Sequence, residues 1–424
     1  MEHLVDGLAD EVGVHAAVSW AHGVALVRHA AEHRLLASPV ELEGGPDAVR
    51  RGLEALAASH PALDSLTDPQ VVGMWKEPIS QAGWARAAQM WTHTPIGDVG
   101  HRVDGFRLGD AYQALSVDAR KSRALRQTPI WVAELLLDLS LEPALDEVGA
   151  DRARMIDPSC GTGHILMSAF HRVRIHVPKG RGPRATVPVE RSLERALEAV
   201  HGVDLDPYAV ILARYRLLAA TASFLKLPIA SVPAGWPVQV AAADALLSTE
   251  EPLLRPGRYH AVAGNPPYIT VRDPHLREQI RRTYPEVCSG KYSLALPFTV
   301  LMTRLARPAG TIAQLTANSF MKREFGKKFI EQYLPTVDLT WVIDTSGCVI
   351  PGHGTPTVIM VHNAQPPQGD TIITIRGNRG EPRMPEDPSQ GLVWRAIEEA
   401  VHQRLALDRL RRGIEVSRST SAVT

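Results

Sequence analysis

The residues best suited to chemistry are Asn265, Pro266, Pro267 and Tyr268, which follow a short apolar run at residues 261–264. The run predicts a buried strand, and the two prolines end its ladder pairing and hold an amide and an aromatic ring at the strand end. The Asn265 side-chain oxygen and the Pro266 carbonyl oxygen can each accept one hydrogen of an exocyclic amine, while Tyr268 can stack on its ring. Holding both hydrogens favours a pyramidal nitrogen with a lone pair free for attack. The alternative is a Pro-Pro turn after a core strand.

This tetrapeptide resembles the Asn-Pro-Pro-Tyr motif of amino-group methyltransferases, chiefly those that act on adenine in DNA. The resemblance implies a catalytic role for the motif, in which the target base is held by its amine. It also implies that the base leaves the duplex stack, because its amine cannot be reached within it. The residues to which this role is assigned are Asn265, Pro266, Pro267 and Tyr268.

A second string, Asp-Pro-Ser-Cys-Gly-Thr-Gly at residues 157–163, lies between a predicted strand at 154–157 and a predicted helix at 164–173. Glycines in this position let a ligand approach the backbone and the helix N-terminus. A phosphate site is one interpretation, but the three-glycine fingerprint and the Walker lysine are absent. An acidic strand end suits a cation better, and S-adenosylmethionine carries a sulfonium and an amino group. The string resembles the cofactor loop of adenine methyltransferases, which implies cofactor contacts for Asp157, Pro158, Cys160, Gly161 and Gly163.

Acidic residues end the next two predicted strands. Asp204 and Asp206 follow residues 200–203, and Asp244 follows a strand predicted at 238–242. An acid after the second strand is placed to bind ribose hydroxyls. The family pattern gives that role to Asp204, whereas Asp206 is either a second cofactor contact or the N-cap of the next helix. Asp244 is placed to accept from the adenine amine of the cofactor, the alternative being a loop aspartate.

Upstream, Thr128 and Pro129 open a predicted helix, with Thr128 as N-cap and Pro129 at the first helical position. The order of the motifs along the chain assigns both residues to the cofactor site. Strands that alternate with helices require a mainly parallel sheet with right-handed crossovers. We therefore predict an α/β fold with a Rossmann-like sheet, of the class I S-adenosylmethionine-dependent methyltransferase type. It stands behind a helical N-terminal domain whose tryptophans fill its own core.

Later elements complete this prediction. Residues 310–316 predict a fifth strand, a helix starts at residue 318, and residues 340–344 and 357–361 predict a closing hairpin. The predicted units are a helical domain at 1–120, a catalytic domain at 121–365, and a linker with a C-terminal helix at 366–424.

Basic residues gather in two segments. The first, residues 171–195, is an insertion that is either a phosphate-contacting loop or a solvated basic loop. The second follows Tyr268, beside the predicted active-site strand. We expect double-stranded DNA to enter there, although a charged helix exterior explains the same pattern. The predicted DNA contacts are Arg272, Arg281, Arg282, Lys291 and, from the late Gly/Pro loop, His353.

Three segments together resemble the PglX family, the phage-growth-limitation methyltransferases of bacterial BREX defence systems. They are residues 200–204, 319–328 and 351–357. The resemblance implies adenine methylation that marks host DNA as self, S-adenosylmethionine as cofactor, and possible contacts with other phage-defence proteins. Two features depart from the family. Residues 371–424 are too few for the long C-terminal region of its members, and the late loop offers Ile350 or His353 where related enzymes place an aromatic ring.

The amino-acid composition limits the kinds of protein and of site that the sequence can form. The 46 Lys and Arg residues balance 46 Asp and Glu residues, so any basic surface must be local. The three cysteines lie far apart without metal-ligand spacing, which predicts no metal and fits a reducing cytoplasm. No apolar run of about 18 residues is evident, so we expect no membrane span. Two other functions stay open: a methyltransferase acting on a glutamine side-chain amide of a protein, and a non-catalytic cofactor-binding subunit of a defence complex.

Overall fold

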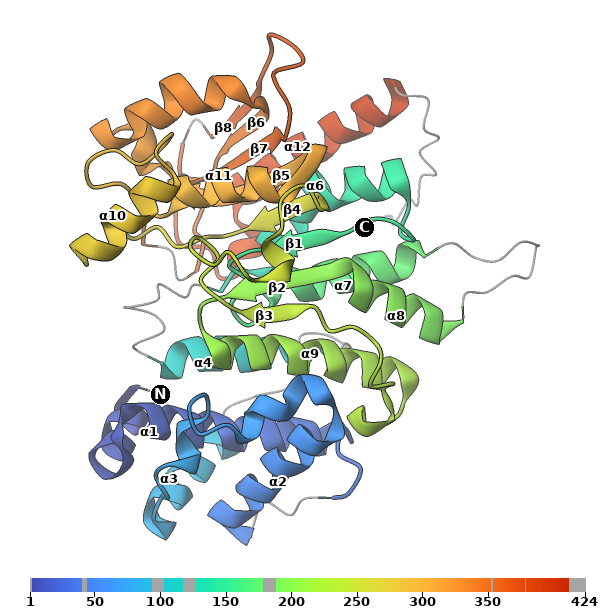
Figure 1. Cartoon of the computed structure of the whole chain (residues 1–424), viewed down its shortest axis with the longest axis vertical. Coiled ribbons are helices and arrows are strands. Elements are labelled where there is room, and N and C mark those ends of the chain that lie inside the picture. The colour runs from blue at the N-terminus through green and yellow to red at the C-terminus, as the bar shows by residue number, and fades with distance from the viewer. Residues whose placement is uncertain are drawn as a thin grey trace.

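The computed structural model describes residues 2–39, 44–93, 103–116, 127–177, 188–351, 354–377 and 379–411. Within these residues the centre is an eight-stranded sheet in the order β3-β2-β1-β4-β5-β7-β6-β8 (Figure 1). Its first five strands run parallel, and β7 is antiparallel to both β5 and β6. The strands are β1 (Met155–Asp157), β2 (Val200–Asp204), β3 (Val240–Ala242), β4 (Tyr259–Gly264), β5 (Ala306–Ala317), β6 (Asp338–Asp344), β7 (Thr357–Asn363) and β8 (Ile373–Arg376).

Helices cover both faces of the sheet, and the alternation of side chains along β4 shows how. Ala261 and Ala263 pack in one hydrophobic cluster, whereas Val262 between them packs in another. The first cluster includes residues of α6 (Ile130–Val148), α7 (His164–His176), α8 (Val189–Ala199) and α12 (Leu392–Arg411). The second includes residues of α10 (Pro274–Thr283) and α11 (Ala295–Leu305). This confirms the predicted α/β class and the hairpin of β6 and β7.

The N-terminal region is helical, as predicted, but it does not have a core of its own. Its helices are α1 (Glu2–Glu32), α2 (Pro46–Ser59), α3 (Gln81–His93) and α4 (Phe106–Leu115). Trp84 and Trp91 are buried in a cluster that also contains Tyr215 and Leu218 of α9 (Pro207–Leu225). Figure 1 shows α9 between the N-terminal helices and the β3 edge of the sheet. The tryptophans therefore fill a core that the helices share with the sheet domain.

Two parts of the sequence prediction were wrong. The segment after β5 is not a regular helix but a series of short turns, at Asn318–Met321, Glu324–Gly326 and Phe329–Tyr333. Gly326 packs so closely on the Phe320 carbonyl that a Cβ would clash there, which explains a tight turn at this point. Strand β8 was not predicted. It pairs with β6 beyond the predicted boundary at residue 365, so the sheet extends into the segment predicted as linker.

One helix among the described residues, Pro207–Leu225, is long and apolar enough to cross a membrane. The sequence predicts a helix at residues 209–222, and its apolar composition was not noted there. However, 78% of its apolar window is buried inside the protein, as in the core helix of a folded domain. Residues on opposite sides of α9 belong to two different hydrophobic clusters, which accounts for its apolar composition.

Candidate active site

A cavity of about 1050 Å³ opens at the carboxyl ends of β1, β2, β3 and β4. This is the edge at which parallel α/β sheets bind ligands. The cavity brings together nearly all residues that the sequence assigns to the cofactor and to catalysis. Its wall includes Thr128, Asp157, Pro158, Cys160, Gly161, Asp204, Asp206, Asp244, Asn265, Pro266, Pro267 and Tyr268.

Asn265 is held in a defined orientation by Thr128. Its side-chain nitrogen donates a hydrogen bond of 3.1 Å to the Thr128 hydroxyl, which is buried. The Asn265 amide oxygen accepts from the Tyr268 hydroxyl, so the first and last residues of the motif lie against each other. Thr128 holds the nitrogen and Tyr268 holds the oxygen, so both polar atoms of the Asn265 amide are fixed in orientation at the wall of the cavity.

Thr128 therefore has a different local role from the one predicted. Helix α6 begins at Ile130, and Pro129 is its N-cap residue, so both positions are shifted by one from the prediction. The Thr128 hydroxyl is not a cap but the partner of Asn265. Sequence reasoning linked Thr128 to the site by its order along the chain, and it missed the hydrogen bond to the catalytic motif.

The glycine loop has the backbone conformation that its sequence predicts. Gly161 and Gly163 have φ values of 52° and 86°, in the left-handed region that glycine adopts most easily. Gly163 also packs against Ala213 of α9, where a Cβ would lie 3.0 Å from the alanine side chain. Cys160 is buried, and burial raises the pKa of its thiol well above the usual value, so the thiol stays protonated.

Asp157 is a deeply buried carboxylate of the cavity, with 2% of its surface exposed. It accepts hydrogen bonds from the backbone and the hydroxyl of Ser159. Burial raises the pKa of Asp157 to about 7, and the negative charge of Asp204 adds to the shift. A cation bound near Asp157 would lower this pKa and stabilise the charged form.

Asp204 ties the second strand to the glycine loop. One carboxylate oxygen accepts from the Gly161 backbone at 2.8 Å, and the other accepts from the Asp206 backbone at 2.9 Å. Asp206 caps α9 by accepting from the backbones of Tyr208 and Ala209. The N-cap alternative is therefore confirmed for Asp206, and direct cofactor binding by its carboxylate stays a prediction.

Asp244 follows β3 and lines the cavity. One of its oxygens accepts from the backbones of Leu246 and Leu247, which closes a turn. This is the geometry of a loop aspartate, and it holds the carboxylate at the rim of the cavity. Its predicted contact with the adenine of a cofactor stays a prediction.

The predicted DNA contacts do not share one environment. Arg272 is exposed and lines the cavity. Arg281 and Arg282 both form ion pairs with Glu278 on α10, which fits the alternative of a charged helix exterior. Lys291 is exposed, and His353 lies outside the described residues. Arg272 is thus the basic residue that the geometry places best for a nucleic acid.

The late Gly/Pro loop lines the cavity with residues other than those predicted. Ile350 is buried in the cluster of α6, α7 and α12, so it does not face a base. Gly354 and Thr355 line the cavity in its place.

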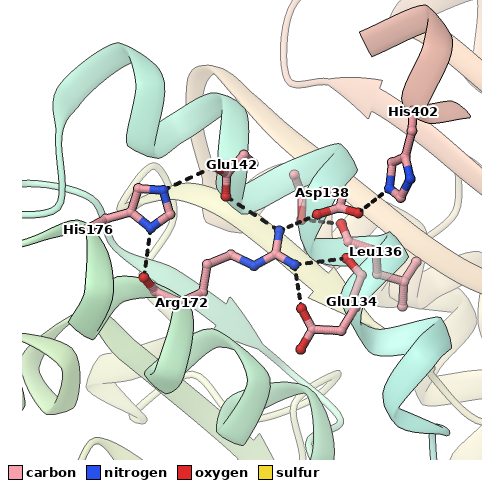
Figure 2. Close-up of polar contacts among 8 residues, drawn as sticks. Glu134, Leu136, Asp138, Glu142, Arg172, His176 and His402 are labelled. Atoms are coloured by element: carbon pink, nitrogen blue, oxygen red, sulfur yellow. Dashed lines mark hydrogen bonds and ion pairs between the residues drawn. The ribbon is translucent and has the colours of Figure 1, made fainter. Parts of the chain in front are cut away.

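The basic insertion makes structural contacts at its described ends, and its contact with phosphates stays a prediction. Arg195 donates to the carbonyls of Ala150 and Ala153, and residues 178–187 lie outside the described residues. Arg172 of α7 forms ion pairs with three carboxylates of α6, as Figure 2 shows. These carboxylates lie at successive fourth positions of one helix face: Glu134, Asp138 and Glu142.

This Arg172 cluster also includes two histidines and lines a separate cavity of about 530 Å³. His176 pairs with Glu142, and His402 of α12 pairs with Asp138 (Figure 2). The hydrogen bond to Asp138 raises the pKa of His402, and the one to Glu142 raises the pKa of His176. The cluster thereby joins α6, α7 and α12.

Comparison with known proteins agrees with this geometry. Residues 198–348 match the family described as Eco57I restriction-modification methylase. Solved structures share the fold. The type IIL restriction-modification enzyme MmeI in complex with DNA aligns over 90% of this chain and 59% of its own, with a TM-score of 0.63 at 14% identity. A modification subunit of a putative type I restriction enzyme from Vibrio vulnificus aligns over 96% and 90%, with a TM-score of 0.59 at 13% identity.

The fold and the family match are those of methylases of the restriction-modification class. Within that class, the chain is 37% identical, over 92% of its length, to the adenine-specific methyltransferase PglX of Streptomyces coelicolor. It is also 25% identical, over 53% of its length, to the type II methyltransferase M.BstVI of Geobacillus stearothermophilus. The chain belongs to the PglX family, and it spans 38% of the length of each of these two relatives.

Proposed function

We propose that this chain transfers a methyl group from S-adenosylmethionine to the N6 amine of an adenine in double-stranded DNA. The observation that carries the proposal is the Asn265 amide, held by Thr128 at the end of β4 inside the large cavity. The volume of about 1050 Å³ lies at the upper end of ligand pockets, which supports a site for both a cofactor and a base.

The residues at the ends of β1, β2 and β3 suit the cofactor, which supplies the methyl group from a sulfonium. Gly161 leaves space for close approach to the backbone, and the Asp204 carboxylate accepts hydrogen bonds from ribose hydroxyls. Asp157 places negative charge beside the cationic part of the cofactor. Asp244 accepts from its adenine amine.

The residues at the end of β4 suit the target base, which must leave the stack to be reached. The oxygens of Asn265 and Pro266 accept the two hydrogens of the amine, and Tyr268 stacks on the ring. A sulfonium held at the ends of β1 and β2 would supply the methyl group to this nitrogen. The extra proton on the nitrogen leaves to solvent. Catalysis in this arrangement depends on orientation and on fixed dipoles.

Family membership supports adenine in DNA over a glutamine amide as the methyl acceptor, and Arg272 is the basic residue best placed at the entrance to the cavity. We propose that the chain acts in the cytoplasm, as part of a phage-defence system that marks host DNA. Contacts with other defence proteins belong to the same proposal.

The test is calorimetric titration of the chain with S-adenosylmethionine, followed by tritium transfer to unmethylated DNA and to protein extracts. We expect binding and transfer to DNA, with N6-methyladenine found after digestion to nucleosides. Binding without transfer to DNA would contradict independent catalysis and favour the non-catalytic alternative. Transfer to protein alone would support the glutamine-amide alternative, and absence of binding would contradict the proposal.

A further inference from the structure

Helix α4 of the N-terminal region lies directly against the cofactor loop. Gly109 of α4 has no side chain, and a Cβ there would lie 2.6 Å from the His164 ring and still closer to the Thr162 hydroxyl. Gln127 joins the two segments, since its amide nitrogen donates to the Gly109 carbonyl and its oxygen accepts from Thr162. Arg216 of α9 adds a bridge between the carbonyls of Asp104 and Thr162. The position of α4 relative to the loop is thus closely defined.

One side chain of α4, that of Tyr112, reaches the acidic residues at the end of β2. Tyr112 is buried, and its hydroxyl donates a 2.7 Å hydrogen bond to one carboxylate oxygen of Asp206. The other oxygen of Asp206 caps α9. The Asp206 backbone donates to Asp204, whose second oxygen accepts from Gly161. A chain of hydrogen bonds therefore runs from the N-terminal helices to the glycine loop.

We infer that Tyr112 is a positioning residue for the cofactor site and acts through Asp206 on the orientation of Asp204. This inference rests on the proposed function, because it assigns Asp204 to the ribose of S-adenosylmethionine. It extends that function by making an N-terminal helix, which carries no recognisable methyltransferase motif, a part of the cofactor site.

The physical basis is the closeness of two carboxylates. Asp204 and Asp206 are separated by one residue, and the backbone N–H group of Asp206 donates to the Asp204 carboxylate. The Tyr112 hydroxyl stabilises the charge on Asp206 in a buried place, where hydrogen bonds to charged groups are strong. Without it, the buried Asp206 carboxylate loses one of its hydrogen-bond donors. Movement of Asp206 would then shift the backbone N–H group that orients Asp204.

The surroundings of Tyr112 are rigid enough to transmit this effect. Its ring packs against those of Tyr208 and His22, at centroid distances of 5.0 and 5.8 Å. Burial lowers the pKa of His22 to about 4, so its ring is neutral. One ring nitrogen faces the Leu108 carbonyl, which can only accept, so the other nitrogen accepts from the Tyr208 hydroxyl. Replacement of Tyr112 by Phe removes the hydroxyl and keeps this packing.

Tyr215 offers a matched control on the same interface. It is a buried tyrosine of α9 whose hydroxyl is bonded to His29 of α1 at 2.8 Å. That contact joins the N-terminal helices to α9 as Tyr112 does, but it involves neither Asp204 nor Asp206. Tyr215→Phe therefore measures the general effect of losing a buried hydroxyl between the same two parts of the protein.

The experiment compares wild type, Tyr112→Phe and Tyr215→Phe by calorimetric titration with S-adenosylmethionine, by the cofactor KM and kcat, and by thermal unfolding. We expect Tyr112→Phe to weaken cofactor binding about tenfold and to raise the KM while kcat stays within about twofold. Tyr215→Phe should match wild type in affinity and KM. Equal affinities for wild type and Tyr112→Phe would overturn the inference and leave the proposed function intact, whereas a wild type that does not bind would overturn both.

Asp206→Ser tests the same link from its other end. Serine caps helices as well as aspartate does, but it is too short to keep the bond to Tyr112. We expect Asp206→Ser to weaken cofactor binding by a similar factor, and Tyr112→Phe to have no further effect in that background. Additive effects of the two substitutions would contradict a shared route. This variant also decides the matter if Tyr112→Phe does not fold.

Discussion

The cavity at the strand ends and the Arg172 cluster both contain several carboxylates, but the two environments shift a carboxylate pKa in opposite directions. In the Arg172 cluster, one guanidinium and two histidines face Glu134, Asp138 and Glu142 (Figure 2). Burial alone would raise the pKa of Asp138, yet His402 and Arg172 more than offset it and lower the pKa. In the cavity, burial and the charge of Asp204 raise the pKa of Asp157 to about 7.

This difference separates a structural cluster from a binding site. The Arg172 cluster supplies its own counter-charges and so stabilises the contact of α6 with α7 and α12. Asp157 is stabilised mainly by the backbone and hydroxyl of Ser159, and its raised pKa means that the folded chain disfavours its charge. A cationic ligand relieves that cost when it binds. The raised pKa of Asp157 therefore supports a binding site in the cavity, and the paired charges of the Arg172 cluster support a structural role there.

The largest expected effect is that of Asn265→Ala in the cavity. Loss of one precisely placed polar group in an active site typically lowers the rate about 100- to 1,000-fold, and we expect at least this loss of methyl transfer. Cofactor affinity should be unchanged, because the proposal assigns Asn265 to the base and not to the cofactor. Tritium transfer and calorimetry measure the two quantities. Loss of cofactor affinity in this variant would contradict the assignment of Asn265 to the base.

Asp204→Ala sharpens the assignment within the same cavity. It removes the charged acceptor at the end of β2 and the bond to Gly161. We expect the Kd for S-adenosylmethionine to rise about 10- to 100-fold, since hydrogen bonds to charged groups contribute about 1.5–3 kcal/mol. Residual transfer at saturating cofactor should remain. An unchanged Kd in calorimetry would remove Asp204 from the ribose role.

Arg172→Met tests the other side of the comparison. Arg172 is 11% exposed and faces three carboxylates, so its loss leaves partly buried negative charges without their shared cation. We expect the free energy of unfolding to fall by about 2 kcal/mol, less than for a fully buried pair because solvent screens the cluster. Urea unfolding gives this value. Cofactor affinity should stay at the wild-type level, and a large loss of affinity would mean that the two regions are coupled.

The sequence predicted the motifs better than it predicted their contacts. Motif order along the chain placed Asp157, Asp204 and Asn265 at neighbouring strand ends because parallel strands present their carboxyl ends at one edge. It could not show that Thr128 binds Asn265, since that bond joins residues 137 positions apart. Strand β8 was missed because a four-residue edge strand carries too little apolar pattern to be recognised.

The N-terminal helices show the same limit more clearly. Helical periodicity predicted that they exist, but not that they share a core with α9 or that Tyr112 reaches Asp206. Such contacts depend on how two helices from distant parts of the chain pack together. The boundary predicted at residue 120 stays a prediction, and the N-terminal helices share a hydrophobic cluster with α9 across it.

The smallest expected effects concern pH, and here the two regions should respond differently. The raised pKa of Asp157 means that the carboxylate gains its charge as pH rises through about 7. The charged form should therefore increase about tenfold between about pH 6 and 8, and affinity for a cationic cofactor with it. Asp157→Asn should remove this rise in a calorimetric series. A wild-type affinity independent of pH would contradict an ionised Asp157 beside the cofactor.

For the Arg172 cluster, the expected pH dependence is that of the folding stability. The pKa of His402 is raised by Asp138, so the protonated ring is favoured in the folded state. Its contribution is fully present below the unfolded pKa of about 6.5 and is lost as pH rises through the higher folded value. The difference in Tm between wild type and His402→Gln should thus be larger at low pH than at high pH, while cofactor affinity stays the same in both. A Tm difference that grows with pH would mean that His402 is neutral in the folded protein, and α12 would then be held by Trp394 packing on Trp131 rather than by charge.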